Sequence, residues 1–274
     1  MYGVIDRFSE DVDLTYDIRS LLPEFAGVDG DPIPESRSAA DRLSRNAREA
    51  PRDWVREVPA PALREGLVAT GIEGADVQME GTVLFLSYPH AIPQASEYVK
   101  PRILVEFGAR SSGEPASPAD IVCDAAPFLP ELDFPTARPR VMAAERTFWE
   151  KATAAHVYCR QERLRSERFA RHWYDLAHLH LGGLAERALA DRDLAHRVAT
   201  HKSWFFRERS AVGDPVDYPA AVRGDLRLVP GGEARNDLAE DYARMAESGL
   251  LPMGALDFEE LMEICARIEE LANR

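Results

Sequence analysis

The stretch RFSEDVDLT, residues 7–15, alternates acidic with apolar side chains: Val12 and Leu14 follow Asp11 and Asp13 in turn. A period of two predicts a β-strand, because successive side chains of a strand point to opposite faces of its sheet. Asp11 and Asp13 then share one face, and we expect Val12 and Leu14 to anchor the opposite face in the core. The stretch therefore predicts a strand that presents two neighbouring carboxylates.

These paired aspartates have two interpretations. Like charges this close repel each other, and a divalent cation is the usual compensation; hard oxygen ligands favour Mg²⁺ or Mn²⁺. The alternative is a polar strand edge or turn without an ion, because the pattern D-x-D is common.

A third acid supports the metal interpretation. Glu106 interrupts the apolar run at residues 103–107, where an unpaired buried carboxylate would be costly. Its expected partner is Arg102, Arg110 or a metal ion shared with the aspartates. Two aspartates on one strand and a third acid on a neighbouring strand are the ligands that two-metal phosphoryl transfer requires.

The remaining patterns divide the chain into two regions. Strands are predicted at 76–80, 83–88, 102–107 and, in short form, 121–123, with a loop at 111–118. A surface helix of mixed charge is predicted over 35–57, ending near Pro51, and amphipathic helices over 147–165, 166–181, 234–248 and 257–272. The predicted fold class is α+β, with a sheet-bearing core over residues 1–142 and a helical domain over residues 143–274.

Capping patterns refine two of these helices. Thr147 and Glu150 have the T-x-x-E spacing of a capping box, and Asp257 is expected to cap the last helix. Lys151 then lies in a first helical turn, where a cation opposes the helix dipole. Binding of a phosphate explains a lysine at that position better than helix stability does.

The helix predicted over 166–181 carries a second group of charged residues. Arg168, Arg171 or His172, and Asp175 follow the spacing i, i+3 or i+4, and i+7, which places them on one helical face. The alternative is an Arg171–Asp175 surface ion pair, worth about a few tenths of a kcal/mol.

Composition excludes several classes of protein. The 274 residues include 47 acidic and 33 basic side chains, and the net charge of −14 argues against non-specific coating of nucleic acid. Residues 138–171 nevertheless hold nine Lys and Arg against four Asp and Glu, which suits either a phosphate-bearing ligand or a solvated helix face. No apolar run approaches the roughly 20 residues of a membrane span, and three scattered cysteines argue against a disulfide framework or thiolate zinc site. We expect a cytoplasmic protein without a membrane partner.

Four strings in order resemble the AbiEii/AbiGii toxin family of nucleotidyltransferase-fold proteins, to which the mycobacterial MenT toxins are similar. They are GVIDRFSEDVDLTYD, KPRILVEFGAR, ERTFWEKATAAH and RFARHWYDLAHL, and LVPGGEARNDLAEDYARM near the carboxyl end extends the resemblance over nearly the whole chain.

The resemblance implies a polymerase-β-like nucleotidyltransferase core followed by a helical domain that contributes Lys151 and Asp175 to the site. Its site residues fall into overlapping sets. The implied catalytic residues are Asp11, Asp13, Lys151 and Asp175; the implied nucleotide-binding residues are Ser9, Lys151, Arg171 and His172; and the implied metal ligands are Asp11, Asp13 and Glu106.

The implied function is that of a toxin in a toxin–antitoxin or phage-abortive system. It transfers a nucleotide from an NTP to RNA, with the acceptor end of tRNA as the expected target, and Mg²⁺ or Mn²⁺ as the expected cofactor. Asp175 would orient or deprotonate the attacking hydroxyl, arginines near 163–171 would contact RNA phosphates, and an antitoxin protein is the further expected partner. Two alternatives stay open: a non-catalytic binding protein with a degenerate nucleotidyltransferase fold, and a metal-dependent phosphodiesterase.

One departure from the family concerns its Gly-Gly-Thr/Ser motif, which supplies backbone N–H groups to phosphates just upstream of the RFSED string. No glycine pair precedes Arg7 in this sequence. Either the natural start lies upstream of Met1 or this copy has lost the motif, and we expect weak nucleotide binding by the chain as given. Loss of the preceding helix is also expected to expose part of the apolar face of the sheet.

Overall fold

The computed structural model describes residues 2–9, 11–21, 25, 27–89, 101–163 and 168–274. Its main sheet has the strand order β1–β4–β3–β2, formed by β1 (Asp11–Thr15), β2 (Asp76–Glu80), β3 (Val83–Ser87) and β4 (Arg102–Gly108). β1 runs parallel to β4, whereas β3 is antiparallel to both of its neighbours. The strands predicted at 76–80, 83–88 and 102–107 are confirmed.

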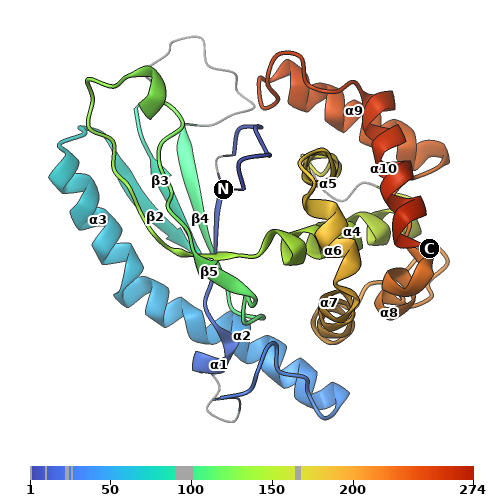
Figure 1. The fold of residues 1–274 in the computed structure, drawn as a ribbon. Coiled ribbons are helices and arrows are strands. Elements are labelled where there is room, and N and C mark those ends of the chain that lie inside the picture. The colour runs from blue at the N-terminus through green and yellow to red at the C-terminus, as the bar shows by residue number, and fades with distance from the viewer. Residues whose placement is uncertain (1, 10, 22–24, 26, 90–100, 164–167) are drawn as a thin grey trace.

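Two long helices, α2 (Arg37–Glu57) and α3 (Pro59–Thr70), lie along one face of this sheet (Figure 1). Val55 of α2 packs there against Val105 and Phe107 of β4. The prediction that the first helix ends near Pro51 is wrong, because α2 continues through this proline to Glu57. Proline removes one helical hydrogen bond, and burial of the turn around Val55 against the sheet offsets that loss.

The prediction that Val12 and Leu14 anchor in the core is also wrong. Val12 is 44% exposed and Leu14 is 40% exposed. β1 is an edge strand whose hydrogen-bonded neighbour is β4, and the cluster beneath α2 and α3 draws its buried strand residues from β2, β3 and β4. The apolar face of β1 therefore stays open to solvent.

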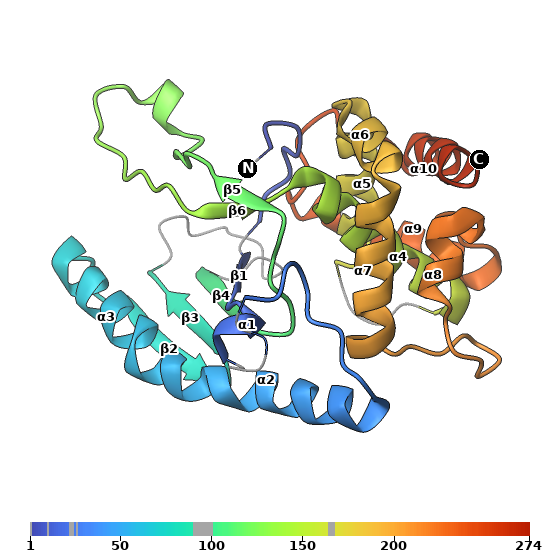
Figure 2. The same cartoon turned by 60° about the horizontal axis from the view of Figure 1, so that its bottom comes forward.

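A short antiparallel ribbon connects the sheet to the helical region. It consists of β5 (Ala116–Pro118) and β6 (Arg140–Met142), so part of the predicted loop at 111–118 is a strand. The strand predicted at 121–123 is reduced to one bridge between Ile121 and Ala137. Between Ile121 and Ala137 the chain forms a projecting lobe that contains the 3-10 helix η2 (Ala126–Phe128) (Figure 2).

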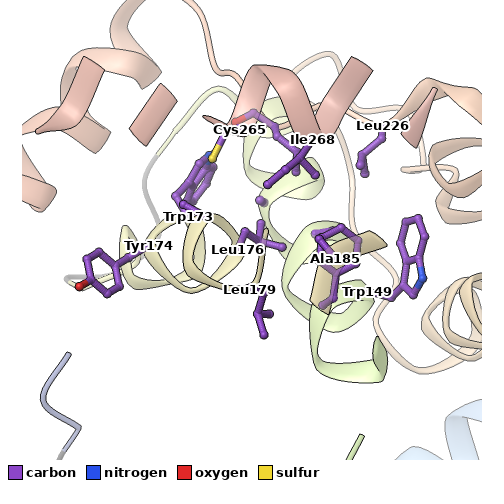
Figure 3. Close-up of a cluster of buried hydrophobic side chains, with 14 of the residues drawn as sticks. Trp149, Trp173, Tyr174, Leu176, Leu179, Ala185, Leu226, Cys265 and Ile268 are labelled. Atoms are coloured by element: carbon purple, nitrogen blue, oxygen red, sulfur yellow. The ribbon is translucent and has the colours of Figure 1, made fainter. Parts of the chain in front are cut away.

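The rest of the chain is helical. Its elements are α4 (Ala144–Gln161), α5 (Arg171–Leu181), α6 (Leu184–Ala190), α7 (Arg192–Phe205), α8 (Tyr218–Ala220), η3 (Ala221–Asp225), α9 (Gly232–Glu247) and α10 (Phe258–Ala272), and a short helix, α1 (Ile18–Leu21), follows β1. Figure 3 shows Trp173 and Leu176 of α5 directed toward Cys265 and Ile268 of α10 in the largest hydrophobic core. No helix in the described residues is long and apolar enough to cross a bilayer.

The two predicted helix caps have different outcomes. Asp257 forms a complete capping box with Glu260 at the start of α10, as predicted. The prediction of a capping box at Thr147 is wrong, because α4 begins three residues earlier, after Ala143. Thr147 lies inside the helix, and its hydroxyl lies 2.6 Å from the hydroxyl of Tyr2.

Residues 2–8, which we call the N-terminal strap, cross the helical region before the chain enters β1. The Phe8 amide donates a 2.9 Å hydrogen bond to the Leu250 carbonyl. Gly182, just after α5, allows a close approach, since a Cβ atom there would lie 2.4 Å from a methyl group of Val4. In Figure 1 the strap is the dark blue segment between the sheet and the helices.

A buried ionic network also joins the two regions. Arg146 of α4 lies 2.7 Å from Asp31 and 3.4 Å from Glu150 (guanidinium N to carboxylate O), and Lys202 of α7 lies 2.9 Å from Glu150. Burial alone would raise the pKa values of Asp31 and Glu150, but the surrounding positive charges hold both below their ordinary values.

Candidate active site

The register of β1 against β4 aligns the three predicted carboxylates. Asp13 lies directly opposite Glu106, and Asp11 lies opposite Leu104. Because Val105 and Phe107 face α2, alternation turns Glu106 and both aspartates to the other face of the sheet.

The sequence predicted that Glu106 is buried within an apolar run. This prediction is wrong, because Glu106 is exposed at this face of the sheet. Neither expected arginine pairs with it: Arg102 lies over the ring of Phe85 and Arg110 over that of Phe206. Partial desolvation raises the pKa of Glu106, and the charges of Asp13 and Asp11 with a hydrogen bond to Asp13 raise it further. The crowding of acids that the motif predicted is therefore present on the sheet.

Asp175 of α5 lies between two cations. Its carboxylate accepts hydrogen bonds of 2.7 and 2.9 Å from Arg7 of the strap and lies 2.7 Å from Lys151 Nζ of α4. The side chain of Asp175 is only 1% exposed. Burial alone would raise its pKa, but the bonds and charges from Arg7 and Lys151 hold that pKa below its ordinary value.

The position of Lys151 differs from the predicted one. It lies in the interior of α4 rather than in a first turn, because the helix begins at Ala144. A helix-dipole argument therefore does not apply to it, and its partner is the carboxylate of Asp175.

Two further predicted residues open helix α5. Arg171 donates a 2.5 Å hydrogen bond to Asp11, which joins the helix to the sheet. His172 is desolvated beside the positive charges of Lys151 and Arg171, and these causes, in that order, put its pKa well below the ordinary value. Its Nδ1 atom is buried and has no hydrogen-bond partner among the residues that the structure describes.

Two other predicted placements differ. Ser9 is exposed shortly before β1 and forms no hydrogen bond with another described residue. The face predicted on a helix over 166–181 is wrong for Arg168, which precedes α5 in a left-handed backbone conformation, φ 62°. Residues 166 and 167 lie outside the described residues.

The donor chemistry of the site fits a hard divalent cation. Asp13 and Glu106 lie opposite each other on paired strands and bring two carboxyl groups together, and carboxylate oxygens are the ligands that Mg²⁺ and Mn²⁺ prefer. Asp11, in contrast, pairs with Arg171. Within the described ranges, no group of three or more His, Cys, Asp or Glu side chains has an arrangement that would hold a metal ion.

A sequence profile for a protein family, described as "Nucleotidyl transferase AbiEii toxin, Type IV TA system", matches residues 1–264. The chain belongs to this family. No curated protein and no solved structure matches this chain. Membership in the AbiEii family implies a nucleotidyltransferase fold and an NTP as substrate. It also implies a relation to an antitoxin in a type IV toxin–antitoxin system.

Two residues of this AbiEii chain matter to the site geometry although sequence reasoning assigned them no role. Arg7 holds Asp175 from the strap. Asp241 of α9 is fully buried and accepts hydrogen bonds of 2.8 and 2.9 Å from the amides of Arg168 and Ala170, at the start of α5. Both residues lie inside the sequence strings that resemble the family. Their partners are far away in the chain, however, so no local sequence pattern predicts these contacts.

Proposed function

We propose that this AbiEii protein is a divalent-cation-dependent nucleotidyltransferase with a polymerase-β-like core that transfers a nucleotide from an NTP to RNA, with the tRNA acceptor end as target. The observation that carries the proposal is the juxtaposition of Asp13 and Glu106 on paired strands with the cation-rich start of α5 and Lys151 of α4. The carboxylates suit metal ions and the cations suit a triphosphate.

In this proposal each side chain has a distinct role. Asp13 and Glu106, with Asp11 when it exchanges Arg171 for the ion, would hold the Mg²⁺ or Mn²⁺. The bound cation would neutralise charge on the triphosphate and activate the attacking oxygen.

Lys151, Arg171 and His172 would bind the nucleotide. The lysine and arginine supply positive charge for phosphate oxygens, and His172, whose lowered pKa keeps the ring neutral, lies beside them. The pKa of Asp175 is lowered, and its carboxylate is paired with Arg7 and Lys151. Both facts argue against a general-base role and favour a positioning role, in which Asp175 orients Lys151. Ser9 keeps its expected place beside the nucleotide.

Incubation with Mg²⁺, each labelled NTP and total tRNA tests the transfer. We expect label to join the tRNA with wild type and to be lost with Asp13→Ala, which removes a metal ligand. Glu80→Gln, an exposed acid on β2, is the matched control and should label as wild type does. RNA that shortens instead of gaining label would identify the phosphodiesterase and overturn the proposal.

A thermal-shift titration tests the metal site apart from activity. Mg²⁺ or Mn²⁺ should raise the melting temperature of wild type more than that of Glu106→Gln, because binding to the folded state alone stabilises it. Glu80→Gln should respond as wild type does. Equal shifts in wild type and Glu106→Gln would remove Glu106 from the metal site.

A further inference from the structure

A second place in the fold has the chemistry of a ligand site. It is a cleft of about 310 Å³ between α2 and the carboxyl end of α7, and none of the candidate active-site residues lines it. Figures 1 and 2 both show the start of α2 close to the end of α7. We refer to it as the α2–α7 cleft.

Four arginines line this cleft, against the two acids Asp41 and Glu208. Arg207 forms an ion pair with Asp41. Arg45 and Arg48 are exposed and have no hydrogen-bond or ion-pair partner in the described part of the chain. In a protein of net charge −14, this local excess of guanidinium groups suits an anion.

Arg110 extends this positive cluster into the interior. Its guanidinium carbon lies 4.0 Å from the centroid of the Phe206 ring. Desolvation lowers the pKa of Arg110, and the nearby charge of Arg48 lowers it further. Binding of an anion between Arg48 and Arg110 would relieve this repulsion.

Aromatic side chains decide which anion fits best. The half-buried rings of Trp204 and Phe206 line the same cleft as the arginines. Guanidinium groups bind phosphate in a bidentate manner, and aromatic rings stack on nucleobases of single strands. Together they match a nucleotide, whereas an acidic peptide would use the arginines alone.

The neighbouring surface favours a strand over a free nucleotide. Arg207 and Glu208 also line a second cleft of about 690 Å³, which continues to the end of α4 and contains Arg163 and Arg209 beside the acid Glu162. The α2–α7 cleft alone is at the lower end of the range for ligand sites, about 300–1,000 Å³. Positive charge that continues past it suits the next phosphates of a chain.

We propose that the α2–α7 cleft binds single-stranded RNA, with phosphates on Arg45 and Arg48 and a base against Trp204. This RNA site lies apart from the carboxylates of the candidate active site, so it would hold the RNA away from its reacting end. The inference rests on the proposed function for the identity of the RNA as substrate, but not for binding itself.

Fluorescence anisotropy with a labelled 12-nucleotide single-stranded RNA tests the site in the full chain. We expect Arg45→Glu/Arg48→Glu to weaken binding at least tenfold. Loss of two phosphate contacts should also reduce the slope of log K against log salt by roughly 1.4, since single strands give about 0.7 per contact. Arg197→Glu, an exposed arginine on α7 outside the cleft, is the matched control and should bind within twofold of wild type.

A second variant tests stacking. Trp204→Leu should weaken binding about fivefold or more with the salt slope unchanged, because it removes a base contact rather than a charge. Circular dichroism and melting temperature must match wild type for each variant. Wild-type affinity in Arg45→Glu/Arg48→Glu, or an equal loss in Arg197→Glu, would overturn the proposal.

Competition separates the possible ligands. An unlabelled 12-mer should displace the probe, and AMP or a poly-glutamate peptide should not at equal phosphate or carboxylate concentration. Equal displacement by AMP would indicate a mononucleotide site, and binding of poly-glutamate without RNA would indicate an acidic protein partner; either result overturns the proposal.

The tRNA-labelling assay distinguishes this inference from the proposed function. Asp13→Ala should bind the 12-mer as wild type does while losing transfer. Cleft-dependent RNA binding without labelling by wild type would uphold the cleft and reject the transferase. Normal tRNA labelling by wild type, with unchanged RNA binding in Arg45→Glu/Arg48→Glu, would uphold the transferase and reject the cleft as an RNA site.

Discussion

Asp175 illustrates how one residue links stability to the candidate site. Its carboxylate is buried between Arg7 and Lys151, which come from the strap and from α4. We expect Asp175→Asn to lower the free energy of unfolding by roughly 3 kcal/mol, because removal of one partner leaves buried cations uncompensated. Urea unfolding at pH 7 measures this loss.

The pH dependence of that loss has a definite sign. The pKa of Asp175 is lower in the folded chain than its ordinary value, so the carboxylate contributes fully above the unfolded pKa of about 4. The contribution disappears as the pH falls through the folded-state value. The difference between wild type and Asp175→Asn should therefore shrink in acid, whereas Asp193→Asn, an exposed control, should show little difference at any pH.

Among the elements, those with strong local patterns could be predicted from the sequence. β2, β4 and α10 lie where alternation and the cap at Asp257 predict them. Predictions failed where distant packing decides the outcome. α2 passes through Pro51 because the sheet buries its next turn, and α4 begins before Thr147.

The candidate site divides in the same way. The residue types, and a third acid on a strand beside the D-x-D pattern, could be expected from the sequence, and the structure places Glu106 opposite Asp13. Arg7 could not be assigned to Asp175, because 168 residues separate them in the chain. The α2–α7 cleft likewise joins Arg45 and Arg48 to Trp204, and no local pattern predicts that meeting.

Helix α5 depends on a neighbouring helix at its start. Asp241 accepts hydrogen bonds from the amides of Arg168 and Ala170, which lie in the turn directly before α5. Asp241→Ala should lower the free energy of unfolding by roughly 2–4 kcal/mol, because it strands buried donors. Hydrogen exchange should quicken at residues 168–172 before the rest of α5.

Glu240→Ala provides the matched control for this element, since Glu240 is the exposed neighbour of Asp241 on α9. It should leave both stability and exchange nearly unchanged. Uniform acceleration along all of α5 in Asp241→Ala would instead mean that the helix does not open from its start.

In the whole molecule, the network around Arg146 connects the sheet to the helices. We expect Asp31→Asn to leave Arg146 with Glu150 as its remaining carboxylate partner, which weakens the connection. Differential scanning calorimetry should show one unfolding transition for wild type and a broadened or divided transition for Asp31→Asn. The nearby exposed Asp29→Asn is the control, and a single sharp transition in both variants would contradict the prediction.

The N-terminal strap has a consequence for anyone who divides this protein into fragments. Cleavage between residues 142 and 143 would separate the sheet from the helices along the chain, yet residues 2–8 would leave with the sheet while their contacts at Leu250 and Asp175 stay behind. The helical fragment alone would lack Arg7. Two such fragments should regain the candidate site only by reassociating, and a peptide of the first eight residues would then compete with that complementation.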